Sequence, residues 1–122
     1  MRRQFSSLRQ RRCPGCGASM QEKPLAAGVR VDMCPKCRAL WLDHGELREL
    51  IDAPVSERSN PYALLNAEHS ELECPDCAIP LLQRPFPEGS DIMLLQCRSC
   101  AGFFLEPGQL HQIQELLQGG GR

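Results

Sequence analysis

Two short segments of the chain have the apolar pattern of a β-strand. Residues 28–33 (GVRVDM) alternate apolar Val29, Val31 and Met33 with polar residues, as half-buried strands do. Residues 92–96 (IMLLQ) form a more uniformly apolar run of strand length. We therefore predict one such strand in each half of the chain.

A helical pattern follows each of these strands. In the first half, Asp43 is a typical N-cap residue, and Glu46 stands close to the position of a capping box. In the second half, Glu106 is a poorer cap, while Pro107 suits the first helical position, where its missing N–H costs nothing. The apolar stripes of the two predicted helices are Leu47, Leu50 and Ile51, and Leu110, Ile113 and Leu117.

Cysteines bracket both predicted strands in pairs separated by two residues. Seventeen residues lie between the first two pairs, 19 between the last two, and 36 between the second and third pairs. This spacing indicates two units of four cysteines rather than one interleaved set. The pairs are Cys13 and Cys16, Cys34 and Cys37, Cys74 and Cys77, and Cys97 and Cys100.

The residues after the second pair of each unit also repeat. Leu40-Trp41-Leu42 aligns with Phe103-Phe104-Leu105, and the helix starts that follow align as well. Self-similarity of this kind indicates an internal repeat. The aligned residues of the helix starts are Asp43 with Glu106, His44 with Pro107, Gly45 with Gly108, and Leu47 with Leu110.

Composition makes a metal the expected source of stability. The chain has 122 residues, eight cysteines and only 5% aromatic residues, and units of about 40 residues seldom fold without disulfides or a metal. The N-terminal sequence lacks the apolar run of a secretion signal and no stretch is long enough to span a membrane, so we expect a cytoplasmic protein with reduced thiols.

Two Cys-x2-Cys pairs about 15–20 residues apart are a typical spacing for a structural zinc site. We therefore predict two Zn²⁺ ions, each bound by one unit of four cysteines, although four sulfurs also suit iron. A disulfide framework would require a secretion signal, and a thioredoxin-type motif would require a single pair in a βαβ context.

These sites divide the chain into five predicted segments. They are a basic flexible arm (1–12), a first zinc ribbon (13–52), a linker (53–73), a second zinc ribbon (74–118) and a flexible tail (119–122). The predicted fold class is a small metal-stabilised α+β protein with two tandem ribbons. Each ribbon is expected to be a short β-hairpin or sheet with two cysteine turns, followed by a short helix.

No catalytic constellation accompanies the cysteines. His44 aligns with Pro107, so we interpret it as a surface residue rather than a fifth ligand or a general base. Trp41 and Phe104 occupy aligned positions, which favours a packing role for both. Because a site closed by four thiolates leaves zinc no open position for water, we expect no enzymatic activity and no small-molecule substrate.

Charge is distributed unevenly along the chain. The net charge is −1, but residues 1–12 contain five arginines and no acid. Such an arm can bind phosphates, and basic residues of the first ribbon could extend the same patch. The candidate nucleic-acid-binding residues are Arg2, Arg3, Arg9, Arg11, Arg12, Arg30, Lys36 and Arg38.

The first unit resembles a known family. Its motifs are Cys13-Pro14-x-Cys16-Gly17, Val29-x-Val31-Asp32-x-Cys34-x2-Cys37 and Trp41-Leu42-Asp43-x-Gly45-Glu46-Leu47. They are similar to those of the bacterial zinc-ribbon family named after the N-terminal ribbon of transcription factor IIB. Arg38-Ala39 replaces the Gly-Gly of that family, and the second unit is more divergent. The resemblance implies zinc ribbons with cysteine ligands and suggests a role in transcription.

Three hypotheses for function follow from these observations. The first is a non-enzymatic adaptor that docks on a protein assembly such as RNA polymerase, because the chain outside the arm is acidic. The second is direct nucleic-acid binding through the arm and the first ribbon. The third is a redox-sensitive zinc switch, in which oxidation of the cysteines releases the metal. We expect no association with membranes.

Overall fold

A computed structural model of the chain describes residues 11–25, 28–51, 67–87 and 89–119. We call residues 11–51 the first half and residues 67–119 the second half. The expectations for residues 1–10 of the arm, 53–66 of the linker and 120–122 of the tail lie outside the described residues. No helix in these ranges is long and apolar enough to cross a membrane.

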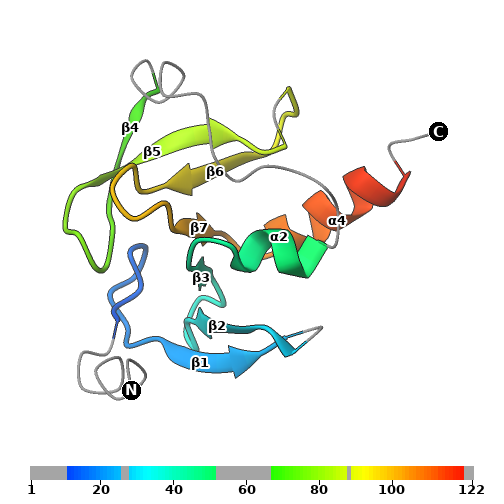
Figure 1. Cartoon of the computed structure of the whole chain (residues 1–122). Helices are drawn as coiled ribbons and strands as arrows, with labels where there is room; N and C mark the ends of the chain where they lie inside the picture. The colour runs from blue at the N-terminus through cyan, green and yellow to red at the C-terminus, as the bar shows by residue number, and fades with distance from the viewer. Residues whose placement is uncertain (1–10, 26–27, 52–66, 88, 120–122) are drawn as a thin grey trace.

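The described residues form seven strands and two helices (Figure 1). The first half contains β1 (Gln21–Pro24), β2 (Arg30–Met33), β3 (Leu40–Leu42) and α2 (Glu46–Ile51). The second half contains β4 (His69–Glu73), β5 (Pro80–Pro85), β6 (Met93–Gln96), β7 (Phe103–Leu105) and α4 (Gln109–Gly119). The strands predicted from residues 28–33 and 92–96 correspond to β2 and β6, and both predicted helices are present.

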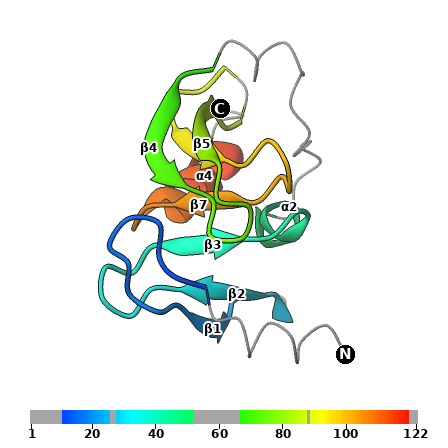
Figure 2. The ribbon, with the colours of Figure 1, turned by 90° about the vertical axis from the view of Figure 1, so that its left-hand side faces the viewer.

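All seven strands belong to one antiparallel sheet in the order β1-β2-β3-β7-β6-β5-β4 (Figures 1 and 2). The prediction of a short hairpin or sheet plus a helix in each ribbon is therefore wrong in part, because the strands of both ribbons form a single sheet. The physical reason is that β3 and β7 each have an unpaired edge within their own half. By pairing with each other they satisfy their backbone hydrogen bonds and bury their apolar residues together.

The central pairing of β3 with β7, which we call the seam, has internal two-fold symmetry. Trp41 lies opposite Phe104, Leu40 opposite Leu105, and Leu42 opposite Phe103. Because Trp41 and Phe104 are aligned residues of the repeat, a local two-fold axis passes between them. The two halves therefore pair like the subunits of a symmetric dimer joined in one chain.

Apolar side chains gather in two clusters. One contains the buried residues of both helices together with those that face them from the sheet, including Leu42, Phe103 and Leu105. The other contains Trp41, Phe104 and the cysteines. In Figure 1 the loops that carry the cysteines lie to the left of the sheet and the helices to the right. Both clusters include residues from both halves, so the core is shared.

The helix starts repeat as closely as the strands. The backbone N–H of Asp43 donates to Oε1 of Glu46 at 2.8 Å, and that of Glu106 donates to Oε1 of Gln109 at 2.8 Å. Gly45 and Gly108 precede the helices with φ of 95° and 89°, a conformation that glycine adopts without strain. His44, which lies in the first of these turns, is exposed, as predicted.

The structure places strand β4 (His69–Glu73) in the last five residues of the predicted linker. It pairs with β5 across the Cys74–Cys77 turn and forms one edge of the sheet. The sequence HSELE was interpreted as linker because its apolar content is low. As an edge strand it needs to bury little more than Leu72, which is partly buried in the cysteine-containing cluster.

Candidate metal centres

The four cysteine turns share one backbone geometry. In each, the carbonyl of the first cysteine accepts a hydrogen bond from the N–H four residues later, and its own N–H donates to the carbonyl five residues later. In the Cys34 turn, for example, these bonds join Arg38 and Ala39 to Cys34, both at 2.8 Å. The turn brings both sulfurs of each Cys-x2-Cys pair to the same side of the loop.

The residue directly after each pair is in the left-handed region. Its φ is 82° at Gly17, 70° at Arg38, 60° at Ala78 and 65° at Ala101. Only the first of these four is a glycine. The left-handed conformation costs a residue with a Cβ roughly 1–2 kcal/mol, so three of the four turns contain local strain.

The turns gather the cysteines into two clusters that fit zinc. Site 1 consists of Cys13, Cys16, Cys34 and Cys37, and site 2 of Cys74, Cys77, Cys97 and Cys100, with the sulfurs of each set within 4.8 Å of one another. All eight are free thiols. Sulfur pairs lie 3.3 and 3.6 Å apart in site 1 and 3.8 Å apart in site 2. A zinc tetrahedron with bonds near 2.3 Å has sulfurs about 3.8 Å apart.

Backbone N–H groups donate hydrogen bonds to the sulfurs. These bonds favour the thiolate form of the cysteine, which is the form that binds a metal cation. Cys34 Sγ accepts from the N–H of Cys37 at 3.4 Å, and Cys97 Sγ accepts from the N–H groups of Ser99 and Cys100 at 3.3 and 3.5 Å. Burial alone would raise the pKa of the Cys34 thiol. Hydrogen bonds from the Cys37 N–H, the Cys16 thiol and the Lys36 N–H outweigh burial and lower this pKa to about 6.

The aligned thiols of the two sites respond in the same way. The pKa of Cys97 is also lowered by backbone and thiol hydrogen bonds that outweigh its burial. Burial raises the pKa of Cys13 to about 12 and that of Cys74 to about 11. Zinc has to displace the protons of these thiols, so its affinity falls as pH falls.

The two sites differ in how far their sulfur ligands reach the surface. In each site, two cysteines are almost completely buried: Cys13 and Cys34 in site 1, and Cys74 and Cys97 in site 2. The difference lies at Cys16, which is exposed, whereas its counterpart Cys77 is only partly accessible. At this aligned position, site 1 is therefore more accessible to a thiol reagent than site 2.

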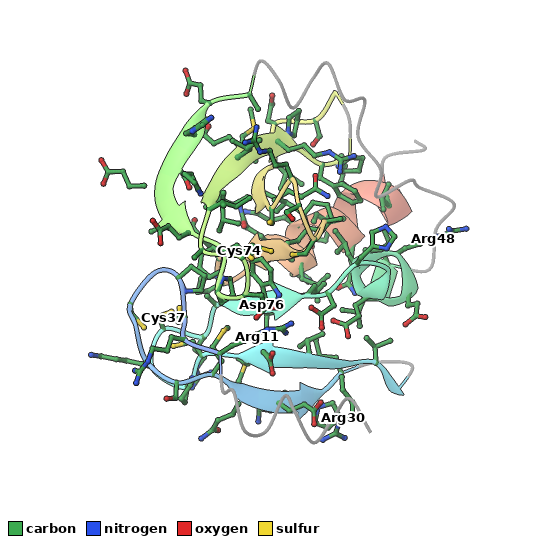
Figure 3. All side chains as sticks on the ribbon, turned by 60° about the vertical axis from the view of Figure 1, so that its left-hand side comes forward. Arg11, Arg30, Cys37, Arg48, Cys74 and Asp76 are labelled. Carbon is green, nitrogen blue, oxygen red and sulfur yellow. The ribbon has the colours of Figure 1, made fainter. Side chains whose placement is uncertain are left out.

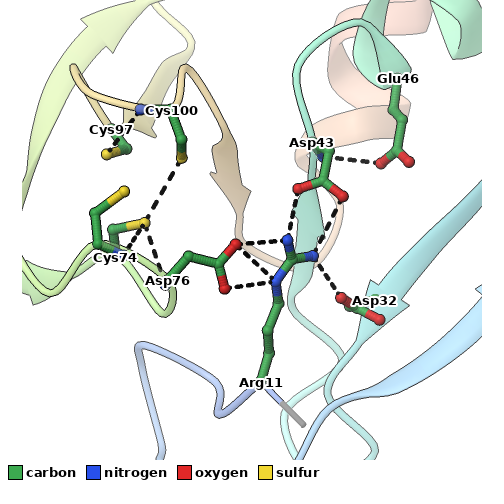
Figure 4. A network of polar contacts seen from close by, with 9 residues as sticks. Arg11, Asp32, Asp43, Glu46, Cys74, Asp76, Cys97 and Cys100 are labelled. Carbon is green, nitrogen blue, oxygen red and sulfur yellow. Dashed lines mark hydrogen bonds and ion pairs between the residues drawn. The ribbon is translucent and has the colours of Figure 1, made fainter. Parts of the chain in front are cut away.

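Arg11 lies in an ion-pair network and not on an open arm. Its guanidinium contacts Asp32 at 2.7 Å, Asp43 at 2.7 Å and Asp76 at 2.6 Å (Figures 3 and 4). Burial opposes its charge, but the hydrogen bonds with these carboxylates raise the pKa of Arg11 above its ordinary value. Asp76 lies in the Cys74–Cys77 turn of site 2, so the side chain of Arg11 joins the two halves.

The other basic candidates have different surroundings. Arg30 pairs with Glu22 at 3.1 Å. Arg12, Lys36 and Arg38 are exposed around the turns of site 1, where Arg12 donates to the carbonyl of Gly17 at 3.2 Å. Three of the eight candidates are thus exposed in or next to the cysteine turns of site 1. Arg2, Arg3 and Arg9 lie outside the described residues.

Trp41 and Phe104 are both buried beside the cysteines, in the packing role expected for them. Each reaches across the seam. A Cβ built on Gly102, in the second half, would lie 2.9 Å from Cε2 of Trp41 and closer still to Cζ2. A Cβ on Gly15, in the first half, would lie 3.5 Å from Cζ of Phe104. The indole N–H of Trp41 finds no acceptor in the described part of the chain, so packing holds the ring in place.

Sequence reasoning missed three residues of these surroundings: Asp76, Gly102 and Gln109. Only Gln109 had a local signal, because Gln at the third helical position also completes a capping box. Asp76 and Gly102 act through partners in the other half of the chain. The sequence does not reveal those partners.

Four-thiolate clusters on paired cysteine turns, joined to short antiparallel strands, define the chain as a tandem zinc-ribbon protein. The family model described as "Transcription factor zinc-finger", of the TFIIB zinc-ribbon type, matches residues 12–53 and 73–116. The chain belongs to this family and carries two copies of its domain. No match was found among curated proteins or among solved structures.

The prediction of two Zn²⁺ sites is confirmed by the two four-cysteine clusters and by the family. Zinc bound there would supply folding free energy, since one ion would join the two cysteine turns of each half.

Proposed function

We propose that the protein is a non-enzymatic zinc-binding adaptor that docks on a protein assembly. The description of its family makes the transcription machinery, RNA polymerase included, the first assembly to test. Each metal site has its full set of four sulfur ligands, so a bound zinc would keep no position for a reacting water. This favours a structural role for the metal.

The observation that carries the proposal is the position of Arg11. This residue was one of the basic candidates of the arm, and its charge is balanced by three carboxylates of the same chain. The aromatic rings of the described residues give further support, because nonspecific binding of single strands uses exposed rings for stacking. Trp41, Phe86, Phe103 and Phe104 are all buried.

The partner is expected to present a basic surface. On the outer strand β4, His69, Glu71 and Glu73 are exposed. Glu68, which directly precedes the strand, is exposed as well. Three carboxylates along one sheet edge attract basic protein segments and repel nucleic acid.

Affinity capture with the full-length, zinc-loaded chain tests the proposal. We expect one defined set of proteins to be retained from a nuclease-treated lysate and to be lost when Glu71 and Glu73 are both replaced by Lys. The matched control replaces Arg12, Lys36 and Arg38 by Ala and should leave capture unchanged. Capture that disappears with nuclease, or that survives the Glu71→Lys/Glu73→Lys change, would contradict the adaptor proposal.

Direct nucleic-acid binding is the second candidate, and one observation favours it. Arg12, Lys36 and Arg38 surround site 1 and are all exposed. Three phosphate contacts give a slope of about −2 to −3 in a plot of log affinity against log salt concentration. If this candidate is correct, replacing the three residues by Ala should remove most of that slope in a filter-binding titration, while Glu71→Lys/Glu73→Lys should not weaken binding.

A further inference from the structure

Side chains of the first half contact both cysteine turns of site 2. The first contact is that of Arg11 with Asp76, which lies between Cys74 and Cys77 (Figure 4). The N–H of Asp76 donates to Sγ of Cys74 at 3.4 Å. The ion pair therefore acts on a residue whose own backbone orients a sulfur of site 2.

The second contact is made by Trp41. Its ring lies against Gly102, and the absence of a side chain there is what allows this approach. The carbonyl of Gly102 accepts the hydrogen bond from the N–H of Cys97 at 3.0 Å, which closes the Cys97–Cys100 turn. Trp41 therefore supports the second turn of site 2 from outside.

Arg11 and Trp41 also support each other. The guanidinium carbon of Arg11 lies 6.0 Å from the centre of the Trp41 ring, within the range of a cation–π contact. Asp32 and Asp43, both of the first half, hold the same guanidinium at 2.7 Å. The first half thus presents one connected group of side chains to site 2.

Contacts in the opposite direction are fewer. The repeat aligns Arg11 with Leu72 and Asp76 with Gly15, so the second half has no equivalent ion pair to place on site 1. In the second half the ring aligned with Trp41 is the smaller ring of Phe104. A Cβ built on Gly15 of the first half would lie 3.5 Å from this ring, an ordinary contact distance. The support is therefore stronger from the first half to site 2 than from the second half to site 1.

We propose that Arg11 and Trp41 are positioning residues of site 2, so that the second ribbon retains its metal only while the first ribbon is folded against it. Residues that orient metal ligands from outside the coordination sphere typically change metal affinity 10- to 100-fold when removed. Arg11 and Trp41 act in this way although all four sulfurs of site 2 belong to the other half.

Zinc release from the full chain tests the proposal. Arg11→Ala and Asp76→Asn both remove the charge pair across the seam, and Arg30→Ala is the matched control because it removes an ion pair with Glu22 inside the first half. Release to a chromophoric chelator gives the rates. The ¹H–¹⁵N signals of Gly15 and Lys36 report site 1, and those of Asp76 and Ser99 report site 2.

We expect the first two variants to release one of two zinc ions about 10-fold faster than the unmodified chain, with the loss seen at residue 76 and at Ser99. Arg30→Ala should release both ions at nearly the original rates. Trp41, the only tryptophan, should change its emission in the step assigned to site 2.

Several outcomes would overturn the proposal. These are unchanged release in Asp76→Asn, acceleration at site 1 instead of site 2, or an equal effect of Arg30→Ala, which would indicate a general effect of charge. Circular dichroism of the zinc-loaded variants establishes that each is folded. Asp76→Asn keeps the shape of the side chain, so it tests the proposal even if Arg11→Ala does not fold.

Discussion

The two halves of the sheet share their turns, strands and helix starts but differ in the side chains at the seam. Trp41 of the first half lies against Gly102, whereas the aligned residues in the other direction are Phe104 and Ala39. The larger ring, Trp41, thus faces a residue without a side chain. In the aligned combination the smaller ring, Phe104, corresponds to a residue with a methyl group, Ala39. The combined side-chain volume of Trp and Gly is nearly the same as that of Phe and Ala.

Charge differs across the seam in the same way. The first half has Arg11 where the second has Leu72, and the second has Asp76 where the first has Gly15. A symmetric pair of ribbons would place identical residues at both positions. The difference between the halves shows how a repeat becomes one folding unit: complementary size and charge on the two sides make each half specific for the other.

Loss of a metal site has the largest expected effect on this comparison. A structural zinc site can contribute about 10–16 kcal/mol, as much as the stability of an entire domain. If site 2 depends on the first half, Cys34→Ser should lose zinc from both sites, whereas Cys97→Ser should keep about one zinc per chain. Elemental analysis after gel filtration measures this. Equal retention of one zinc by both variants would show that the halves do not differ in this way.

Filling the space at Gly102 has the next largest effect. In Gly102→Ala the new Cβ overlaps the Trp41 ring, and overpacking of this kind costs about 1–3 kcal/mol. Gly15→Ala is the matched control, because a Cβ there meets Phe104 at 3.5 Å, an ordinary contact distance. Urea unfolding at a fixed free zinc concentration measures the cost.

The same position allows a rescue experiment. Adding Trp41→Phe to Gly102→Ala recreates the Phe–Ala combination of the other half and should recover most of the lost stability. The indole N–H donates no hydrogen bond within the described residues, so the exchange of the ring breaks no hydrogen bond there, although it reduces packing and weakens the contact with Arg11. Additive losses in the double variant would contradict the size-complementarity explanation.

The sequence predicted the parts of this structure that depend on neighbouring residues. The spacing of Cys34 and Cys37, the alternation around Val31 and the stripe of Leu47 and Leu50 each lie within a few residues of one another. A tight turn, a half-buried strand and an amphipathic helix are therefore encoded locally. The eight cysteines could be divided into two sites because the two groups are far apart in the chain.

The joining of the halves was not predictable in this way. Leu40-Trp41-Leu42 is apolar whether it faces its own helix or a second ribbon, and three residues are too few to specify a strand partner. Arg11 was interpreted as part of a basic arm because its three partners are distributed over both halves. The edge strand β4 was missed for a related reason, since an edge strand that buries little needs no strong apolar pattern.

Oxidation distinguishes the metal sites by exposure. Cys16 is exposed, whereas its counterpart Cys77 is only partly accessible, so mild peroxide should oxidise Cys16 before Cys77 and release zinc from site 1 sooner than from site 2. The release is followed with a zinc dye, and mass spectrometry of alkylated peptides locates the oxidised cysteines. Cys16→Ser is unsuitable as a control because it removes a ligand, whereas Lys36→Ala leaves all ligands in place and should keep the order. Simultaneous release from both sites would argue against this difference and against a redox role specific to site 1.

The smallest expected effect concerns the strained turns. Arg38 and Ala101 occupy aligned positions with φ of 70° and 65°, where glycine avoids a cost of roughly 1–2 kcal/mol but loses about 0.5–1 kcal/mol through the greater freedom of the unfolded chain. Arg38→Gly and Ala101→Gly should therefore each stabilise the zinc-loaded protein by about 0.5–1 kcal/mol. Gly17→Ala introduces the strain at the equivalent turn and should destabilise it by a similar amount. Unfolding at constant free zinc measures all three. Stabilisation at Ala101 but not at Arg38 would indicate that the Arg38 side chain contributes a contact of its own, and the two halves would then differ at this turn as they do at the seam.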